Sequence, residues 1–170
     1  MGRMSQLQCL IIFVICASAI GCRPEQVELS FHTLERREMS GTGEIWQHDE
    51  PGLLIVATLN DVPQLSDLVT REAEAKLQNL DLDQHFAVAV FQGMSFIVVP
   101  GIVIQRISQS GDTITIYAHI LELVAEAQRP LVVSPYHLVA VQRGDELQGD
   151  IEFVLNVDGK VVSRKARVFP

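Results

Sequence analysis

Five histidines are the side chains best suited to bind a metal ion or to move a proton at neutral pH. A helical zinc site places two ligands three or four residues apart, as in His-x-x-x-His or His-Glu-x-x-His. No two histidines here have that spacing, and the chain after Cys22 contains no cysteine that could supply a thiolate. The sequence therefore predicts no metal and no other cofactor, but scattered edge and surface histidines: His32, His48, His85, His119 and His137.

A nucleophilic active site is also not indicated. Ser95 and Ser134 both lack the Gly-x-Ser-x-Gly turn that exposes a catalytic serine. We therefore predict no catalytic residue and no enzymatic activity. A hydrolase with an atypical site would be considered only if Asp83, His85 and His137 lay within hydrogen-bond reach of one another, beside a pocket.

The cysteines point to chemistry of another kind, because all three lie within the first 22 residues. Residues 9–21 form an unbroken apolar run, which is too short for a spanning helix and is typical of a secretory signal peptide. Its end, Ala19-Ile20-Gly21-Cys22, resembles a bacterial lipobox. That resemblance implies cleavage before Cys22 and thioether lipidation of this residue. A plain secretory signal and an uncleaved anchor are the alternatives.

This interpretation makes residues 1–21 a lipoprotein signal peptide and residues 22–26 a lipidated tether. It predicts an extracytoplasmic protein of the cell envelope, lipid-anchored to a bacterial membrane. The whole chain has 13 Lys plus Arg, 21 Asp plus Glu and a net charge of −8. Such an acidic chain is not held at an anionic membrane by charge, so acyl chains must hold it. The same charge argues against nucleic acid as a partner.

The rest of the sequence alternates apolar and polar residues with the period of β-strands. Strands are expected near residues 27–31, 53–59, 86–91, 102–107, 114–118, 131–133 and 138–142, with a last hairpin at 150–156 and 160–169. One amphipathic helix is expected from Asp61, its cap, to Leu77. We predict an α+β fold, in which a mostly antiparallel β-sheet or partly closed barrel packs against this helix.

Residues 27–143 are expected to form the main domain. Residues 144–170 are expected to form a C-terminal β-hairpin that completes or extends the sheet. This hairpin also carries an unusual group of basic residues, Arg164, Lys165 and Arg167, of which the last two share one face of a strand. They could contact lipid headgroups or an acidic partner, or they could keep the strand edge soluble.

An ordered series of short motifs runs from residue 53 to residue 143. It consists of LLIVATL, the capped segment NDVPQLSDLV, the strand FAVAVFQG, the strand IVIQRI, and Ser134-Pro135-Tyr136. The series resembles the C-terminal domain of PrcB-type protease-complex accessory proteins. The resemblance implies an accessory role, in which a partner protease is stabilised or regulated at the cell surface.

The resemblance also suggests partner-binding residues. These are Ser134, Pro135 and Tyr136, together with Pro100 and Gly101, which stand where the family has a Gly-Gly-Tyr segment. For Ser134-Pro135-Tyr136 the residues themselves favour a structural interpretation, since a proline begins strands and a tyrosine packs its ring at a strand end. The functional prediction is a lipid-anchored protein-binding module. The alternative is a lipoprotein that binds lipid or a small molecule inside a β-barrel.

Overall fold

The computed structural model describes residues 25–37, 46–94, 101–121, 134–144 and 147–169. These residues form nine strands, a 3₁₀-helix and an α-helix. In chain order they are β1 (Val27–Glu28), β2 (Phe31–Arg37), β3 (Gly52–Val56), η1 (Leu59–Gln64), α1 (Arg71–Gln78), β4 (His85–Phe91), β5 (Ile102–Ser110), β6 (Thr113–Ile120), β7 (Tyr136–Gln142), β8 (Gly149–Val157) and β9 (Lys160–Phe169). No helix in these ranges is long and apolar enough to cross a membrane.

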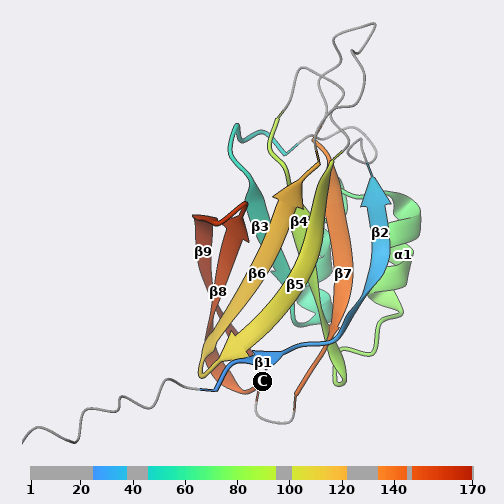
Figure 1. Cartoon of the computed structure of the whole chain (residues 1–170). Helices are drawn as coiled ribbons and strands as arrows, with labels where there is room; N and C mark the ends of the chain where they lie inside the picture. The colour runs from blue at the N-terminus through green and yellow to red at the C-terminus, as the bar shows by residue number, and fades with distance from the viewer. Residues whose placement is uncertain (1–24, 38–45, 95–100, 122–133, 145–146, 170) are drawn as a thin grey trace, which may run out of the picture.

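The strands form two sheets that face each other (Figure 1). The first has the order β1-β5-β6-β8-β9 and the second the order β2-β7-β4-β3. Every strand pair is antiparallel except β6 and β8, which run parallel. The predicted α+β fold class is confirmed. The partly closed barrel, which the sequence left open, does not form, because the two sheets remain separate.

Strand β4 explains how the layers are held together. Phe86, Val88 and Val90 belong to the core between the two sheets. Ala87, Ala89 and Phe91, the alternate residues, belong to a second core beneath η1 and α1. A strand buried on both faces is expected to be apolar throughout, as this one is. The molecule therefore has three layers: the five-stranded sheet, the four-stranded sheet and the helices.

The helical segment differs from the single helix that the sequence predicts. It is divided into η1 and α1, and Thr70 in extended conformation caps α1 by accepting a hydrogen bond from the Ala73 N–H at 3.1 Å. Asp61 is not the cap of η1; its Oδ2 instead accepts the Ala57 and Thr58 N–H groups. Two local capping arrangements therefore outcompete one continuous helix. The predicted buried face is nevertheless correct, since Leu65, Val69, Ala73 and Leu77 are all buried.

The expected strand at 27–31 is also divided. β1 pairs with β5 in one sheet, and after Leu29 and Ser30 the chain enters β2 in the other sheet. The alternating pattern continues across the division, which is why the sequence alone does not reveal it. The expected strand at 131–133 lies outside the described residues.

The C-terminal hairpin is part of the core. β8 pairs with β6 on one side and β9 on the other, and its inward residues Ile151, Phe153 and Leu155 lie between the sheets. Its turn is the predicted Asp158-Gly159, with φ of 51° and 85°. Positive φ at both positions is characteristic of the type I′ turn that connects twisted strands.

Candidate functional site

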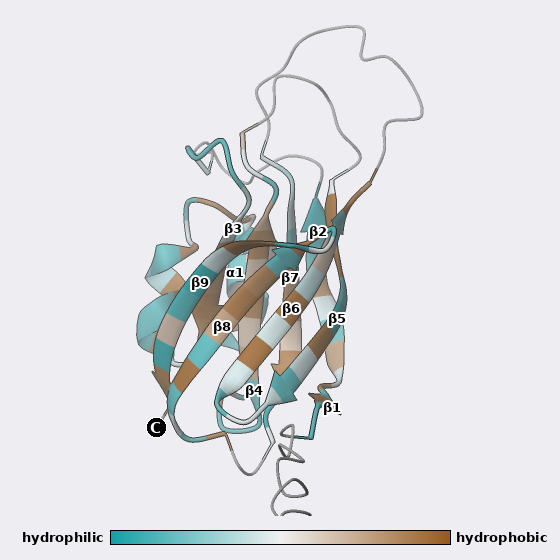
Figure 2. Cartoon of the chain, turned by 60° about the vertical axis from the view of Figure 1, so that its left-hand side comes forward, coloured by the Kyte–Doolittle hydropathy of each residue, from teal (hydrophilic) through white to brown (hydrophobic). Residues whose placement is uncertain are grey.

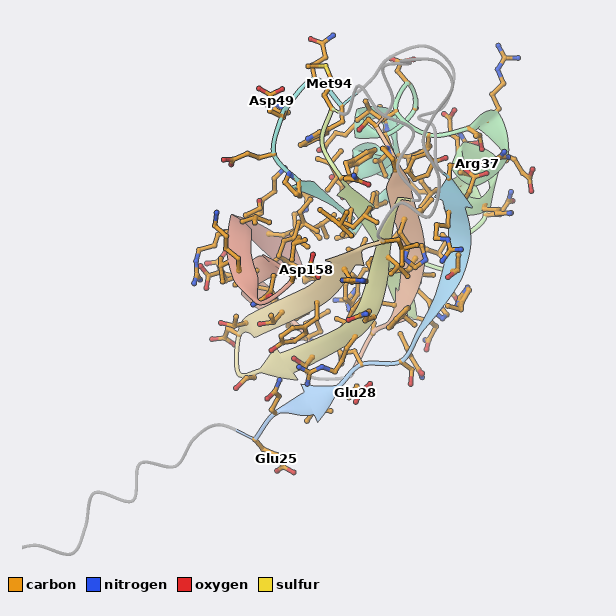
Figure 3. The ribbon with its side chains drawn as sticks, turned by 45° about the horizontal axis from the view of Figure 1, so that its top comes forward. Glu25, Glu28, Arg37, Asp49, Met94 and Asp158 are labelled. Carbon is orange, nitrogen blue, oxygen red and sulfur yellow. The ribbon has the colours of Figure 1, made fainter. Side chains whose placement is uncertain are left out.

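The two ends of the sandwich differ in what the chain places there. The described chain begins at Glu25, three residues after Cys22, and continues through Val27 and Glu28 of β1 at one end. We call this the tether end. Arg37, Asp49 and Met94 lie at the opposite end, which we call the distal end (Figure 3). Glu25 is thus separated from the distal end by the length of the strands.

Four of the five residues suggested for partner binding lie together at the distal end. Gly101 has a φ of +101°, and a Cβ on it would lie 3.5 Å from Cβ of Pro135. Gly101 and Pro135 are buried, as are Ser134 and Tyr136. Pro100 lies outside the described residues. Burial agrees with the structural interpretation of Ser134-Pro135-Tyr136, and their direct contact with a partner stays a prediction.

Tyr136 has a definite structural task. Its hydroxyl donates to Glu35 Oε2 at 2.5 Å and accepts the Thr70 N–H at 3.2 Å. Thr70 also donates its hydroxyl to Glu35 Oε2 at 2.7 Å, and Arg37 Nε donates to Oε1 at 3.0 Å. The network joins β2, β7 and the N-terminus of α1, so it attaches the helix to the four-stranded sheet at a fixed position.

The charges of this network follow from its hydrogen bonds. Burial raises the pKa of the Tyr136 hydroxyl, and donation to Glu35 raises it further, so the phenol stays protonated. Burial alone would raise the pKa of Glu35, but hydrogen bonds from Tyr136, Thr70 and Arg37 outweigh burial and lower it. Glu35 is therefore a carboxylate that accepts hydrogen bonds from three side chains, and it is not poised to exchange protons near neutral pH.

His137 connects the two sheets. Its Nδ1 accepts the Ile104 N–H from β5 at 2.9 Å, and its Nε2 lies 2.9 Å from Thr33 Oγ1 on β2. A backbone N–H can only donate, so Nδ1 carries no proton and Nε2–H donates to Thr33. Burial lowers the pKa of His137 to about 4, with a smaller effect from the charge of Arg36. This histidine is neutral and fully hydrogen-bonded, as a structural residue should be.

The arrangement that would have suggested a hydrolase is not assembled. In the pairing of β4 with β7, His85 lies opposite Gln142 and His137 lies opposite Val90. Five residues of strand separate the two histidines, which is about 17 Å at the usual rise. Asp83 precedes β4 at the His85 end. Within the described ranges, no group of three or more His, Cys, Asp or Glu side chains could hold a metal ion.

The space between the sheets is filled by side chains. The rings of Phe86, Phe153 and Phe169 lie 5.5 to 5.9 Å apart, centroid to centroid, and aliphatic side chains surround them. The described part of the chain therefore offers no barrel interior for a ligand. A pocket of about 440 Å³ opens elsewhere, between β3, the end of α1 and the start of β4. Its lining is mixed: Ala57, Thr58, Leu59, Gln78, Leu80, Asp81, Leu82, Asp83 and Arg143.

The basic residues of β9 are placed differently from one another. Arg164 pairs with Glu152 on the outer face of the sheet at 3.1 Å. Arg167 pairs with Asp61 of η1, which is buried. Lys165 is half-buried, its pKa is lowered by burial, and it forms no hydrogen bond or ion pair with the described residues. The sequence predicts the shared face of Lys165 and Arg167 but not the pairing with Asp61.

Sequence reasoning missed Glu35 and Thr70, and it gave Asp61 only as a helix cap, not as the buried partner of Arg167. Thr70 could have been found, because a threonine before an Arg-Glu-Ala-Glu segment is a helix-cap signal. Glu35 carried no such signal: in the sequence it belongs to a charged surface run, and Tyr136 is 101 residues away. Only the pairing of β2 with β7 brings these two together.

Comparison with known proteins adds no assignment: no family model, no curated protein and no solved structure matches this chain.

Proposed function

We propose that this protein is a lipid-anchored, extracytoplasmic accessory module that binds a partner protein and carries out no chemistry of its own. The observation that supports this most directly is the opposition of the two ends. Glu25 stands three residues after the predicted lipidation site and lies at the tether end, whereas Arg37, Asp49 and Met94 lie at the distal end (Figure 3). A domain anchored at one end presents the other end away from the membrane.

The charge at the tether end supports the same arrangement. Glu25 and Glu28 are exposed there. Asp112 is also exposed, in the turn that joins β5 to β6, and β5 is the strand with which β1 pairs. Carboxylates near an anionic membrane surface are repelled over about a Debye length of 8 Å in physiological salt. Acyl chains on Cys22 would hold the protein, and these charges would keep the domain off the surface.

The distal end is built on a rigid support. β2 and β4 end there, and β5 and β7 begin there, so four strands from both sheets set its shape. The Tyr136–Glu35–Thr70 network holds α1 against the same region, and His137 ties the sheets together one residue further along β7. Such pre-ordering reduces the entropy lost when a partner binds.

A protease is the partner class that the resemblance to PrcB-type accessory proteins implies, and it is part of the proposal. The alternative, a lipoprotein that binds lipid or a small molecule, would need the pocket of about 440 Å³ beside α1, since side chains fill the space between the sheets. That pocket is lined by two aspartates and an arginine as well as by leucines. Its lining does not favour a purely apolar ligand.

The anchor is tested by Cys22→Ala, with Cys16→Ala as the matched control because Cys16 lies within the apolar run. We expect Cys22→Ala to block processing or to release the protein from the membrane fraction, and Cys16→Ala to behave as wild type. Unchanged processing of Cys22→Ala together with unchanged membrane retention after a carbonate wash would refute lipid anchoring.

The binding surface is tested by a photo-crosslinking amino acid placed in the full chain in cells. Asp49 at the distal end and Glu28 at the tether end are both exposed acidic residues, so each serves as the control for the other. One recurring protein crosslinked from position 49 and not from position 28 would support the proposal, and a protease would support the finer form. Crosslinks only to lipid, or recovery of a small molecule without a protein, would favour the alternative.

A further inference from the structure

β9 is the end strand of the five-stranded sheet and has one free edge. It runs for ten residues, the longest strand described, and pairs only with β8 (Figure 1). No backbone hydrogen bond joins it to any other described element. A long unpaired edge of this kind, although its pairing with β8 is shifted once near Val162, is a template on which another extended segment can pair.

The charge of β9 is opposite to that of the chain. Its sequence KVVSRKARVF contains four basic residues and no acidic one, in a chain of net charge −8. Two valines of the strand, Val161 and Val168, are 44% and 64% exposed. No helix among the described residues covers the outer face of the sheet, and hydrophilic and apolar segments both occur along β9 (Figure 2). The edge therefore combines unpaired backbone, positive charge and exposed apolar side chains.

Lys165 and Arg167 face the inner side of the sheet. Lys165 lies opposite Phe153 and Arg167 opposite Ile151, and both of these β8 residues point into the core. Lys165 is half-buried and forms no ion pair with the described residues. Arg167 pairs through Nη2 with Asp61, but its Nε is buried and has no hydrogen-bond partner. Among the described residues, the inner side of the edge thus offers one unpaired cation, Lys165, next to Arg167, whose charge is already paired with Asp61.

We propose that the free edge of β9 binds an extended acidic segment of a partner protein as an added antiparallel strand. A carboxylate of that segment would pair with Lys165, and small apolar residues at its alternate positions would contact the outer face near Val168. The inference deepens the proposed function and rests on it, because it names a surface and a partner chemistry for a protein-binding module.

A second copy of this chain does not fit the edge. Antiparallel pairing of β9 with another β9 would set basic side chains opposite basic side chains, which is destabilising. The basic side chains of β9 therefore select among strands by charge. They repel basic strands, including a second β9, and attract acidic ones. Protection against aggregation and selection of an acidic partner are two results of the same charges.

A lipid surface fits less well than a peptide. Lys165 and Arg167 face the inner side, toward the other sheet, and are not displayed on the open face of the sandwich. Arg164, the cation on that open face, is already paired with Glu152 at 3.1 Å. A membrane needs a broad exposed basic surface, whereas an added strand needs charges that line one edge.

The test uses the purified full-length protein in neutral detergent and a fluorescent nine-residue peptide that alternates Glu and Val. The control peptide has Lys in place of every Glu. We expect the acidic peptide to bind, to weaken as salt is raised, and to slow hydrogen exchange in residues 160–169. Lys165→Glu should weaken binding by about tenfold or more, equivalent to 1.4 kcal/mol.

Arg71→Glu is the matched variant, since Arg71 is exposed at the start of α1 and the charge change is identical. It should leave binding unchanged. Lys165→Gln, with a melting curve for each variant, separates loss of charge from loss of fold. The inference would be overturned if the basic peptide bound as tightly as the acidic one, or if the acidic peptide bound Lys165→Glu as tightly as wild type. It would also be overturned if the peptide slowed hydrogen exchange only outside residues 160–169. Lys165-dependent binding of Cys22→Ala protein to phosphatidylglycerol vesicles without peptide binding would overturn it as well.

These outcomes are separable from the fate of the proposed function. Suppose that a partner is crosslinked from position 49 and that Lys165→Glu does not change its capture. The proposed accessory function would then be supported, and the proposed binding site on β9 would be refuted.

Discussion

The hydroxyl of Tyr136 donates a 2.5 Å hydrogen bond to Glu35, 101 residues earlier in the chain. The bond places an ionised carboxylate beneath the N-terminus of α1, where Thr70 also donates to it. The positive end of the helix and the buried negative charge face each other, an arrangement that helix electrostatics favours. The position of α1 on the sheet is thus fixed by polar contacts as well as by its apolar face.

Tyr136→Phe should destabilise the protein by about 1–3 kcal/mol, because Glu35 loses a donor and the Thr70 N–H loses an acceptor in a buried place. Urea denaturation followed by circular dichroism measures the effect. Tyr117→Phe is the control, since Tyr117 is only half-buried, on the outer face of β6. Equal stability of Tyr136→Phe and wild type would mean that the network does not hold the helix.

Stability should fall as the pH is lowered from 6.5 toward 4. The pKa of His137 is about 4 in the folded protein against the usual 6.5 of a histidine, so between these values the unfolded chain binds more protons. The stabilisation is complete above pH 6.5 and lost on acidification, by about 3 kcal/mol in total. The pKa of Glu35 is lowered from 4.5, so its own stabilisation is lost from about pH 4.5 downward, which overlaps only the acid end of that window.

Urea midpoints at pH 7 and pH 4.5 test this dependence. His137→Gln should be less stable than wild type at pH 7 and should depend less on pH. His48→Gln, which changes an exposed histidine, should retain the wild-type pH dependence. A His137→Gln curve parallel to that of wild type would assign the pH dependence to other groups.

Gly52→Ala should displace the single tryptophan of the chain. A Cβ at residue 52 would lie 2.0 Å from Cζ2 of Trp46, which stacks on Phe91 with ring centroids 5.0 Å apart. We expect a red-shifted emission and a loss of about 1–3 kcal/mol of stability, as for other overpacked sites. Gly144→Ala is the control, because a Cβ there meets nothing within 4 Å. Unchanged emission from Gly52→Ala would show that Trp46 does not pack there.

Truncation after Arg143 should leave an insoluble or unfolded chain. The deletion removes β8 and β9 and with them Ile151, Phe153 and Leu155 of the core between the sheets. It also exposes β6 as a new free edge. A chain that ends at Phe169 is the control and should fold as wild type. A soluble, cooperatively melting product from the truncation at Arg143 would make the hairpin a separable element.

The sequence predicted the features that depend on local patterns. Alternation identified most strands, and Asp158-Gly159 identified the last turn, because these signals lie within a few neighbouring residues. The buried face of the helical segment was also predicted correctly, although Thr70 divides the segment into two. Neighbouring residues alone therefore determined what each segment is.

Pairing between distant segments could not be predicted in this way. Nothing near β6 specifies a parallel partner in β8, and nothing near Glu35 specifies Tyr136. The placement of Ser134 and Tyr136 in the interior depended on the same long-range pairing of β2, β7 and β4. Motif reasoning suggested them for partner contact because it had no information about burial.

The division of the first strand between two sheets has a mechanical consequence. β1 holds to β5 by two paired residues, whereas β2 pairs with β7 from Phe31 to Arg37. A pulling force applied through an N-terminal anchor would act first on the short β1–β5 pairing and would break its hydrogen bonds one after another. Release of residues 26–29 from the sheet would lengthen the tether by about 13 Å. The rest of the sandwich would stay folded, so β1 would act as a releasable segment between the proposed lipid anchor and the folded domain.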